Sequence, residues 1–379
     1  MTAEEAVIYL AGCAVNGLTP DRDTVESLQL PEVYQAARAH MLSACVAVAL
    51  EAAGRADENS AQAIFTAVRR SAIYASAREA VTKRLEEAGI WYVPLKGILI
   101  SADYPKPFMR EMADHDYLYD ASRAQDVKAI MEDLGFSAES VGITNHDVYV
   151  KPPFLCFEMH TALFGPWHRQ SIFDYYKDVE ARLLPGPGVS RHFSPEDLYI
   201  YLTAHEYKHF IGDGAGLRSL LDTCVFLKSH KDLDFDYIAR ETEKLGIADF
   251  ERSSRELAQK VFRGTALLER EKKMLEFICG SGVFGTPTQH FEHIVGDYGS
   301  GLKGKLRYFS HRLILKRSSI REKYPFIYRH RVLYPFFCVY RIGDALIKKR
   351  KAVFAELRAL CRIRDRKKEE WFSDGGNKA

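Results

Sequence analysis

Two aspartates separated by one residue, Asp114 and Asp116, stand in the segment ADHDYLYD, in which apolar and polar residues alternate. Alternation predicts a β-strand, and residues i and i+2 of a strand point to the same side of a sheet. Two carboxylates placed in this way repel each other and are costly to desolvate unless a cation lies between them. Mg²⁺ prefers oxygen ligands and couples to phosphate. The spacing therefore predicts a metal site for phosphate chemistry, although a solvated acidic strand would show the same short pattern.

A third carboxylate occurs in the apolar segment FLCFEMHTAL, which also predicts a strand. Cys156, Glu158 and His160 share one face of that strand because they are two residues apart. If the strand pairs beside the one that carries Asp114, three acids converge. Three carboxylates on adjacent strands suffice for two-metal nucleotidyl transfer, in which one ion binds the triphosphate and the other lowers the pKa of the attacking hydroxyl.

The elements that must position these acids form a small mixed sheet between helical regions. Helical spacing of apolar residues predicts helices at 33–53 and 63–88 before the sheet. The segments at 90–95, 147–151 and 154–163 predict strands, and 122–134 predicts a helix between them. Later helices are predicted at 195–209, 216–230, 235–246 and 249–262, the first of them opened by a serine cap. The fold class is α+β, with regions 1–89 (helical), 90–165 (α/β core), 166–280 (helical) and 281–379 (basic and helical).

An ordered set of short motifs resembles the uncharacterised bacterial nucleotidyltransferase family of the polymerase-beta-like superfamily. The resemblance covers about residues 30 to 230. Its features are Lys96-Gly97 after an apolar strand, Tyr104-Pro105, Arg110, Met112, the Asp114-His115-Asp116 core followed by Leu118, Leu134-Gly135-Phe136, and Glu158 with His160. The helical entry RLEEAGIWYVPLKG and the later AHEYKH and LRSLLD also look like that family.

The resemblance implies the residues of an active site. Asp114 and Asp116 would hold the metal ions, and Glu158 would complete the site and orient or deprotonate the acceptor. Two Mg²⁺ ions are the expected cofactors, with Mn²⁺ as a substitute. The reaction would move a nucleoside monophosphate from an NTP to a hydroxyl or phosphate of an unknown acceptor, which is a small molecule, a glycan or a protein.

The resemblance also implies the contacts to the nucleotide. Lys96 and Gly97 occupy the place where the wider superfamily has a Gly-Ser pair that touches the triphosphate, so the lysine would supply charge to phosphate instead. Arg110 precedes the first carboxylate strand and would contact phosphate as a bidentate donor. A structural ion pair is an equally good interpretation of this arginine.

The segment HEYKH at 205–209 gives a rival hypothesis. On a helix, His205 and His209 face the same way and could bind Zn²⁺, with Glu206 as the general base of a metallopeptidase. A third ligand is not evident, because Ala215 stands where one peptidase class has histidine. The preferred hypothesis is that His205, Lys208 and His209 line the acceptor or nucleotide side of the cleft, or simply pack. His160 is a further candidate for contact with the acceptor or for support of the site. A non-catalytic protein that binds nucleotide or a partner is the remaining alternative.

Charge is distributed unevenly along the chain. Residues 301–379 carry 22 Lys and Arg against 7 Asp and Glu, a net charge of +15, whereas residues 1–300 have a net charge of −13. The segment at 342–368 predicts a basic amphipathic helix that would contact an anionic membrane surface, nucleic acid or the acidic body of the protein itself.

Cysteine use and hydropathy predict the cellular setting. The seven cysteines are far apart and odd in number, which favours reduced thiols in the cytoplasm. The first residues lack a basic stretch typical of a signal peptide, and no apolar run reaches the ~20 residues that a spanning helix needs. A cytoplasmic protein, peripheral at the membrane if the basic segment binds lipid, is therefore expected.

Overall fold

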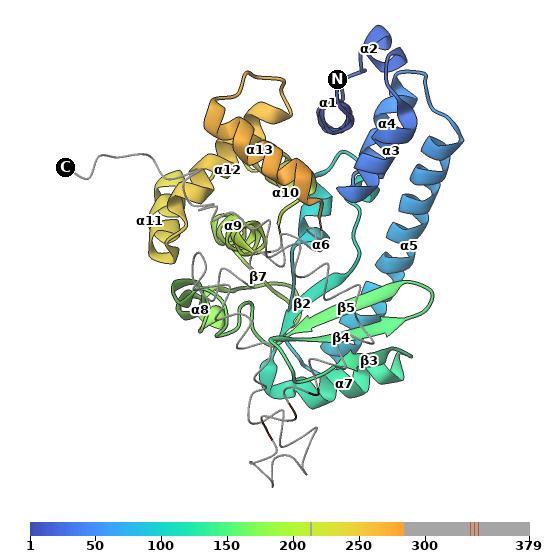
Figure 1. Cartoon of the computed structure of the whole chain (residues 1–379). Helices are drawn as coiled ribbons and strands as arrows, with labels where there is room; N and C mark the ends of the chain where they lie inside the picture. The colour runs from blue at the N-terminus through green and yellow to red at the C-terminus, as the bar shows by residue number, and fades with distance from the viewer. Residues whose placement is uncertain (213, 284–333, 335–336, 338–339, 341–379) are drawn as a thin grey trace, which may run out of the picture. The chain divides into compact units, whose positions relative to one another are not determined.

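The computed structural model of the chain describes residues 1–212, 214–283, 334, 337 and 340. The basic region predicted at 281–379, with its helix at 342–368, lies almost entirely outside these residues. Within the described part, residues 1–210 and 215–283 belong to one compact unit. The fold of this unit is α+β, as the sequence predicts, with helices before and after a mixed sheet (Figure 1).

Helices fill the N-terminal region. They are α1 (Ala3–Asn16), α2 (Arg22–Glu26), α3 (Leu30–Ala39), α4 (Ser43–Ala52) and the long α5 (Glu58–Glu87). The single helix predicted at 33–53 is wrong, because the chain turns between α3 and α4 at Met41, which has a φ of 53°. This turn lets α4 pack against both α1 and α5, and most of its apolar side chains are buried there.

Five strands form the main sheet of the described residues. They are β1 (Tyr92–Pro94), β2 (His115–Tyr119), β3 (Ser137–Ser140), β4 (His146–Lys151) and β5 (Leu155–His160), in the spatial order β1-β2-β5-β4-β3. The central pair, β2 and β5, runs parallel, whereas the other neighbours are antiparallel. The two strands that carry the predicted acids are therefore direct neighbours.

One face of the sheet packs on helices. Tyr117, Phe157, Met159 and Tyr149 are buried in one apolar cluster with residues of α5 and of α7 (Ala124–Asp133). Tyr74 of α5 fixes the sheet at this face. Its hydroxyl lies 3.0 Å from the carbonyl oxygens of residues 113 and 154 and 3.1 Å from the amide of residue 156, which donates to it. The beginnings of β2 and β5 are thus held side by side.

The remaining elements follow the sheet or connect its strands. The short ones are α6 (Gly97–Ile100), η1 (Ser101–Asp103), η2 (Pro107–Met109), η3 (Ala121–Arg123), α8 (Gln170–Tyr175), η4 (Val179–Arg182), β6 (Leu184–Pro185) and β7 (Arg191–His192). The longer helices are α9 (Pro195–Ile211), α10 (Leu217–Ser229), α11 (Phe235–Leu245), α12 (Ala248–Val261) and α13 (Glu269–Ser281). Helix α9 begins as predicted, because Ser194 Oγ accepts a hydrogen bond of 3.0 Å from the Asp197 amide.

Two observations bear on the cellular setting. In the part of the chain that the structure describes, none of the helices is long and apolar enough to cross a bilayer. The cysteines described there, Cys13, Cys45, Cys156, Cys224 and Cys279, are all free thiols.

Candidate active site

The carboxylates of β2 and β5 lie on the face of the sheet opposite the apolar cluster. Asp116 pairs with Glu158 across the parallel ladder, and both alternate with residues whose side chains enter the core. Side chains at paired positions point to the same side of a sheet. The two acids therefore share one face, as the sequence predicts, with Asp116 buried and Glu158 partly exposed.

Asp114 lies directly before β2 and is electrostatically coupled to the other two acids. Its pKa is raised first by burial and then by the negative charges of Asp116 and Glu158, while Lys96 and Arg218 oppose the increase. Asp114 stands two residues before Asp116, which pairs with Glu158 on the neighbouring strand, so the three acids belong to adjoining stretches of the chain. The structure therefore brings together the three acids that the sequence nominates.

Lys96 is the internal counter-ion of this cluster. Its Nζ lies 2.5 Å from Asp116 Oδ1, and the two side chains are only 18% and 6% exposed. Burial opposes the ammonium charge, but Asp116, Tyr201 and Glu158 together raise the pKa of Lys96. Lys96 also has a φ of 48°, a backbone conformation that is uncommon for a residue with a side chain. The backbone bends directly after β1. The amide of residue 95 donates a hydrogen bond of 3.0 Å to the Asp116 carbonyl, and Lys96 is the next residue of the chain.

Two histidines surround Glu158. His160 Nε2 lies 2.9 Å from Asp116 Oδ1 and 3.5 Å from Glu158 Oε2, and its side chain is 5% exposed. His146 Nε2 lies 3.8 Å from Glu158 Oε1. Despite the unfavourable effect of burial, Lys96 and His160 hold the pKa of Asp116 well below its usual range. His160 was expected near the site, whereas sequence reasoning missed His146, whose only signal is its place in a strand that pairs with β5.

Arg110 is engaged in a buried ion pair. Its Nη2 and Nε lie 2.8 and 3.1 Å from the two carboxylate oxygens of Asp222 on α10, and the Tyr104 hydroxyl donates to the same carboxylate at 2.7 Å. Of the two interpretations of Arg110, the geometry supports the structural ion pair. Sequence reasoning gave Asp222 and Tyr104 no role here, because they come from segments far apart in the chain.

Gly97 lies against that ion pair. A Cβ atom at this position would approach Arg110 Nη1 to 2.5 Å and Met112 Sδ to 2.7 Å. A larger residue here would therefore require the Arg110 guanidinium or the Met112 side chain to move, and Asp222 holds that guanidinium in place. This contact links the Lys96-Gly97 bend to the segment that leads into β2.

Helix α9 carries side chains toward the acids. The pKa of Tyr201 is raised by burial and by the charges of Asp116 and Glu158, against the effect of Lys96. One turn later, burial and then the charges of Lys96 and Lys208 hold the pKa of His205 well below its ordinary value. Both pKa shifts respond to the charge of Lys96, and Tyr201 responds also to Asp116 and Glu158.

The HEYKH segment does not form a peptidase-like group among the described residues. His205 Nε2 and His209 Nε2 lie 3.3 Å apart, but Glu206 turns to α12, where it accepts a hydrogen bond of 3.2 Å from Ser254. Burial raises the pKa of Glu206 to about 7. In the part of the chain that the structure describes, the group of three potential metal ligands is His146, Glu158 and His160, which excludes this helix.

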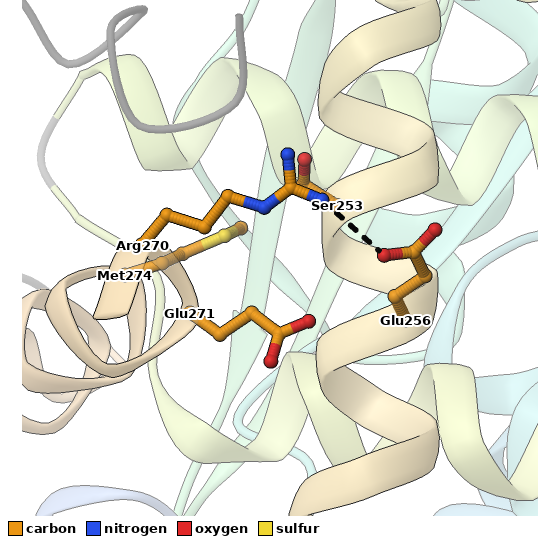
Figure 2. A pocket seen from close by; sticks show the side chains of 5 residues that line it. All are labelled: Ser253, Glu256, Arg270, Glu271 and Met274. Carbon is orange, nitrogen blue, oxygen red and sulfur yellow. Dashed lines mark ion pairs between the residues drawn. The ribbon is translucent and has the colours of Figure 1, made fainter. Parts of the chain in front are cut away.

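A separate depression lies between α12 and α13 (Figure 2). It is lined by Ser253, Glu256, Arg270, Glu271 and Met274. An ion pair of 3.8 Å joins Arg270 Nη2 to Glu256 Oε2 across it. None of these residues belongs to the carboxylate cluster, and we assign no role in chemistry to this depression.

Comparison with known proteins gives one family match. The model of a family described as uncharacterised nucleotidyltransferase matches residues 26–263. The chain belongs to this family. The matched range runs from α3 through α12 and so contains the whole five-stranded sheet, the three acids and helix α9. No curated protein and no solved structure matches the chain.

Proposed function

We propose that the protein transfers a nucleoside monophosphate from an NTP to a hydroxyl or phosphate of an acceptor, with release of pyrophosphate. The observation that carries this proposal is the pairing of Asp116 with Glu158 on one face of β2 and β5, with Asp114 directly before β2. Membership of the family supports the reaction class. The acceptor, which is a small molecule, a glycan or a protein, follows from none of these residues.

The acids fit a divalent cation. Burial, and then the negative charges of Asp116 and Glu158, raise the pKa of Asp114, while Lys96 compensates Asp116 with a positive charge. Asp114, Asp116 and Glu158 would hold Mg²⁺ through carboxylate oxygens, the ligands that this ion prefers, and Mn²⁺ could replace it. When bound, the metal supplies charge stabilisation to the phosphates and a lower pKa to the attacking hydroxyl.

Side chains of the protein would carry out the proton transfer and contact the phosphates. An acceptor oxygen forms a bond to the α-phosphorus while the bond to pyrophosphate breaks, and Glu158, the most exposed of the acids on the strands, takes the acceptor's proton. Lys96, whose Nζ lies against Asp116, would supply its positive charge to the triphosphate. Tyr201 and His205 of α9 border the acceptor side. We leave Arg110 out of the nucleotide contacts because Asp222 engages its guanidinium.

A thermal-shift panel tests the proposal. The four NTPs with Mg²⁺ are added to the full-length wild type, Asp114→Asn, Asp116→Asn and the control Asp236→Asn, which changes an exposed aspartate of α11. A ligand at ~100 times its Kd stabilises the native state by roughly 2.7 kcal/mol. We expect one NTP to stabilise the wild type and the control in a Mg²⁺-dependent manner, and neither site variant. Equal shifts in all four proteins, or none in any, would overturn the proposal.

A pyrophosphate assay and a metal analysis, added to the panel, separate the alternatives. A non-catalytic nucleotide-binding protein would show the Mg²⁺-dependent shift but would release no pyrophosphate with any acceptor preparation. A metallopeptidase using the HEYKH segment would contain stoichiometric zinc and would ignore NTPs. The position of Glu206 against Ser254 does not favour the latter.

A further inference from the structure

A group of potential metal ligands on β4 and β5 offers nitrogen as well as oxygen atoms. His146 and His160 pair directly across the antiparallel ladder of β4 and β5, and Glu158 lies two residues before His160 on the same face. One potential ligand atom from each residue lies within 4.8 Å of those of the other two. The regular register of two central strands, rather than a loop, therefore holds two imidazoles around one carboxylate.

The distances between the histidine nitrogens and the Glu158 oxygens approach those between neighbouring ligand atoms around a bound metal ion. His160 Nε2 lies 3.5 Å from one oxygen of Glu158, and His146 Nε2 lies 3.8 Å from the other. In a tetrahedral site with metal–ligand bonds of about 2.0–2.1 Å, neighbouring donor atoms are roughly 3.3 Å apart. Small side-chain rotations would thus bring the three donors onto one ion. The side chains of His146 and Glu158 are 27% and 23% exposed, which leaves the site open to solvent on one side.

We propose that His146, Glu158 and His160 bind a divalent transition-metal ion of the series from Mn²⁺ to Zn²⁺. Imidazole nitrogen is a preferred ligand of the later ions of this series, and Mn²⁺ binds such mixed sites most weakly among them, whereas Mg²⁺ takes oxygen ligands almost exclusively. The site therefore selects against Mg²⁺ by the chemistry of its donors. Asp116, whose Oδ1 lies 2.9 Å from His160 Nε2, borders the same position and would orient that ring or join as a further ligand.

The ring of His160 presents one nitrogen to this site. Its Nε2 lies against two carboxylates, those of Asp116 and Glu158. An ion bound here needs an unprotonated Nε2, because a ligating imidazole nitrogen must be deprotonated. Among the described residues, Nδ1 of this ring is buried and has no hydrogen-bond partner, so it can carry the ring proton without breaking another contact.

This site shares Glu158 with the proposed nucleotide site but does not depend on the transfer reaction. Ion binding can be measured without nucleotide, and Asp114 has no part in it. The two proposals therefore fail separately.

The test is a titration of Mn²⁺ into metal-free full-length protein, in which EPR of the free aqueous ion reports what remains unbound. A large molar excess of Mg²⁺ is present to fill sites made of oxygen alone. The proteins are the wild type, His146→Gln and the matched control His192→Gln, which changes an exposed histidine of β7. We expect the wild type and the control to bind one ion per chain in this competition. His146→Gln should bind it at least about tenfold more weakly, since even outer-shell partners of metal sites contribute about 10–100-fold.

Measuring both Mn²⁺ affinity and the nucleotide-dependent thermal shift distinguishes the ion site from the proposed nucleotide site. Asp114→Asn should retain the Mn²⁺ affinity measured in excess Mg²⁺ while losing the nucleotide-dependent thermal shift. Equal Mn²⁺ affinity in His146→Gln and wild type, or complete displacement of Mn²⁺ by Mg²⁺ in the wild type, would overturn the ion site. If the wild type still shows the Mg²⁺-dependent NTP shift in that case, the proposed transfer function is unaffected.

Discussion

Replacing Lys96 with methionine removes the internal counter-ion of the site while keeping an apolar stem of similar length. Asp116, whose side chain is 6% exposed, would retain only His160 as a charged or hydrogen-bonding partner at 2.9 Å. Removing one partner of a buried ion pair costs about 3–5 kcal/mol, because the other charge stays buried and uncompensated. With His160 still in place, we expect Lys96→Met to lower the free energy of unfolding by about 3 kcal/mol.

The ionisation of Asp116 determines the direction in which the free energy of unfolding changes with pH. Lys96 and His160 depress its pKa in the folded protein against the effect of burial, so its ionised form stabilises the fold above the unfolded-state pKa of about 3.9. That stability is lost as the pH falls through the lower folded-state pKa. The difference between wild type and Lys96→Met should therefore be largest near neutral pH and shrink below about pH 4.

Urea unfolding of the full-length protein in chelator-treated buffer measures this difference. The matched control is Lys83→Met, because Lys83 pairs with Glu87 at 4.0 Å on the exposed surface of α5 and should contribute at most about 0.5 kcal/mol. Adding Mg²⁺ should stabilise Lys96→Met more than the wild type, since the ion then supplies the missing charge. Equal losses in the two lysine variants at pH 7 would refute the buried ion pair and with it the role of Lys96.

Three further outcomes follow from buried contacts. Arg110→Met breaks the pair with Asp222 and should cost about 3–5 kcal/mol in urea unfolding; a loss below about 1 kcal/mol would mean that the pair behaves as a surface one. Gly97→Ala should cost about 1–3 kcal/mol, because its Cβ would overlap the Arg110 guanidinium, and unchanged stability would contradict that packing. Burial raises the pKa of Glu206 from 4.5 to about 7, so ionisation destabilises the fold increasingly as the pH rises through this interval. Glu206→Gln should match the wild type below pH 4.5 and exceed its stability by up to about 3 kcal/mol above pH 7; parallel pH profiles would contradict the burial effect.

The sheet and the shared face of its acids could be predicted from local patterns. Alternation in β2 and β5 places Asp116, Glu158 and His160 on one side, and the aromatic residues between them enter the core, as binary patterning requires. Ser194 predicts the start of α9, because its hydroxyl caps the helix by accepting a hydrogen bond from the Asp197 amide. These features depend on residues close together in the chain, where period and capping chemistry are sufficient.

Other features depend on contacts that no local pattern encodes. His146 joins the site only because the register of β4 on β5 sets it opposite His160. Asp222 reaches Arg110 across 112 residues, so a phosphate contact and an ion pair could not be distinguished beforehand. The break at Met41 is imposed by the packing of α4 between its neighbours, against an uninterrupted helical pattern. Tertiary packing outweighs helix propensity in such places.

The most direct test of the central claim is calorimetric titration of a non-hydrolysable NTP analogue into the full-length protein, with and without Mg²⁺. The nucleotide is the one identified by thermal shift, and the variants are Glu158→Gln and the control Glu139→Gln, which changes an exposed glutamate of β3. The account predicts Mg²⁺-dependent binding that is retained in the control and weakened in Glu158→Gln. Binding that is indifferent both to Mg²⁺ and to Glu158 would contradict a metal–nucleotide site on β2 and β5.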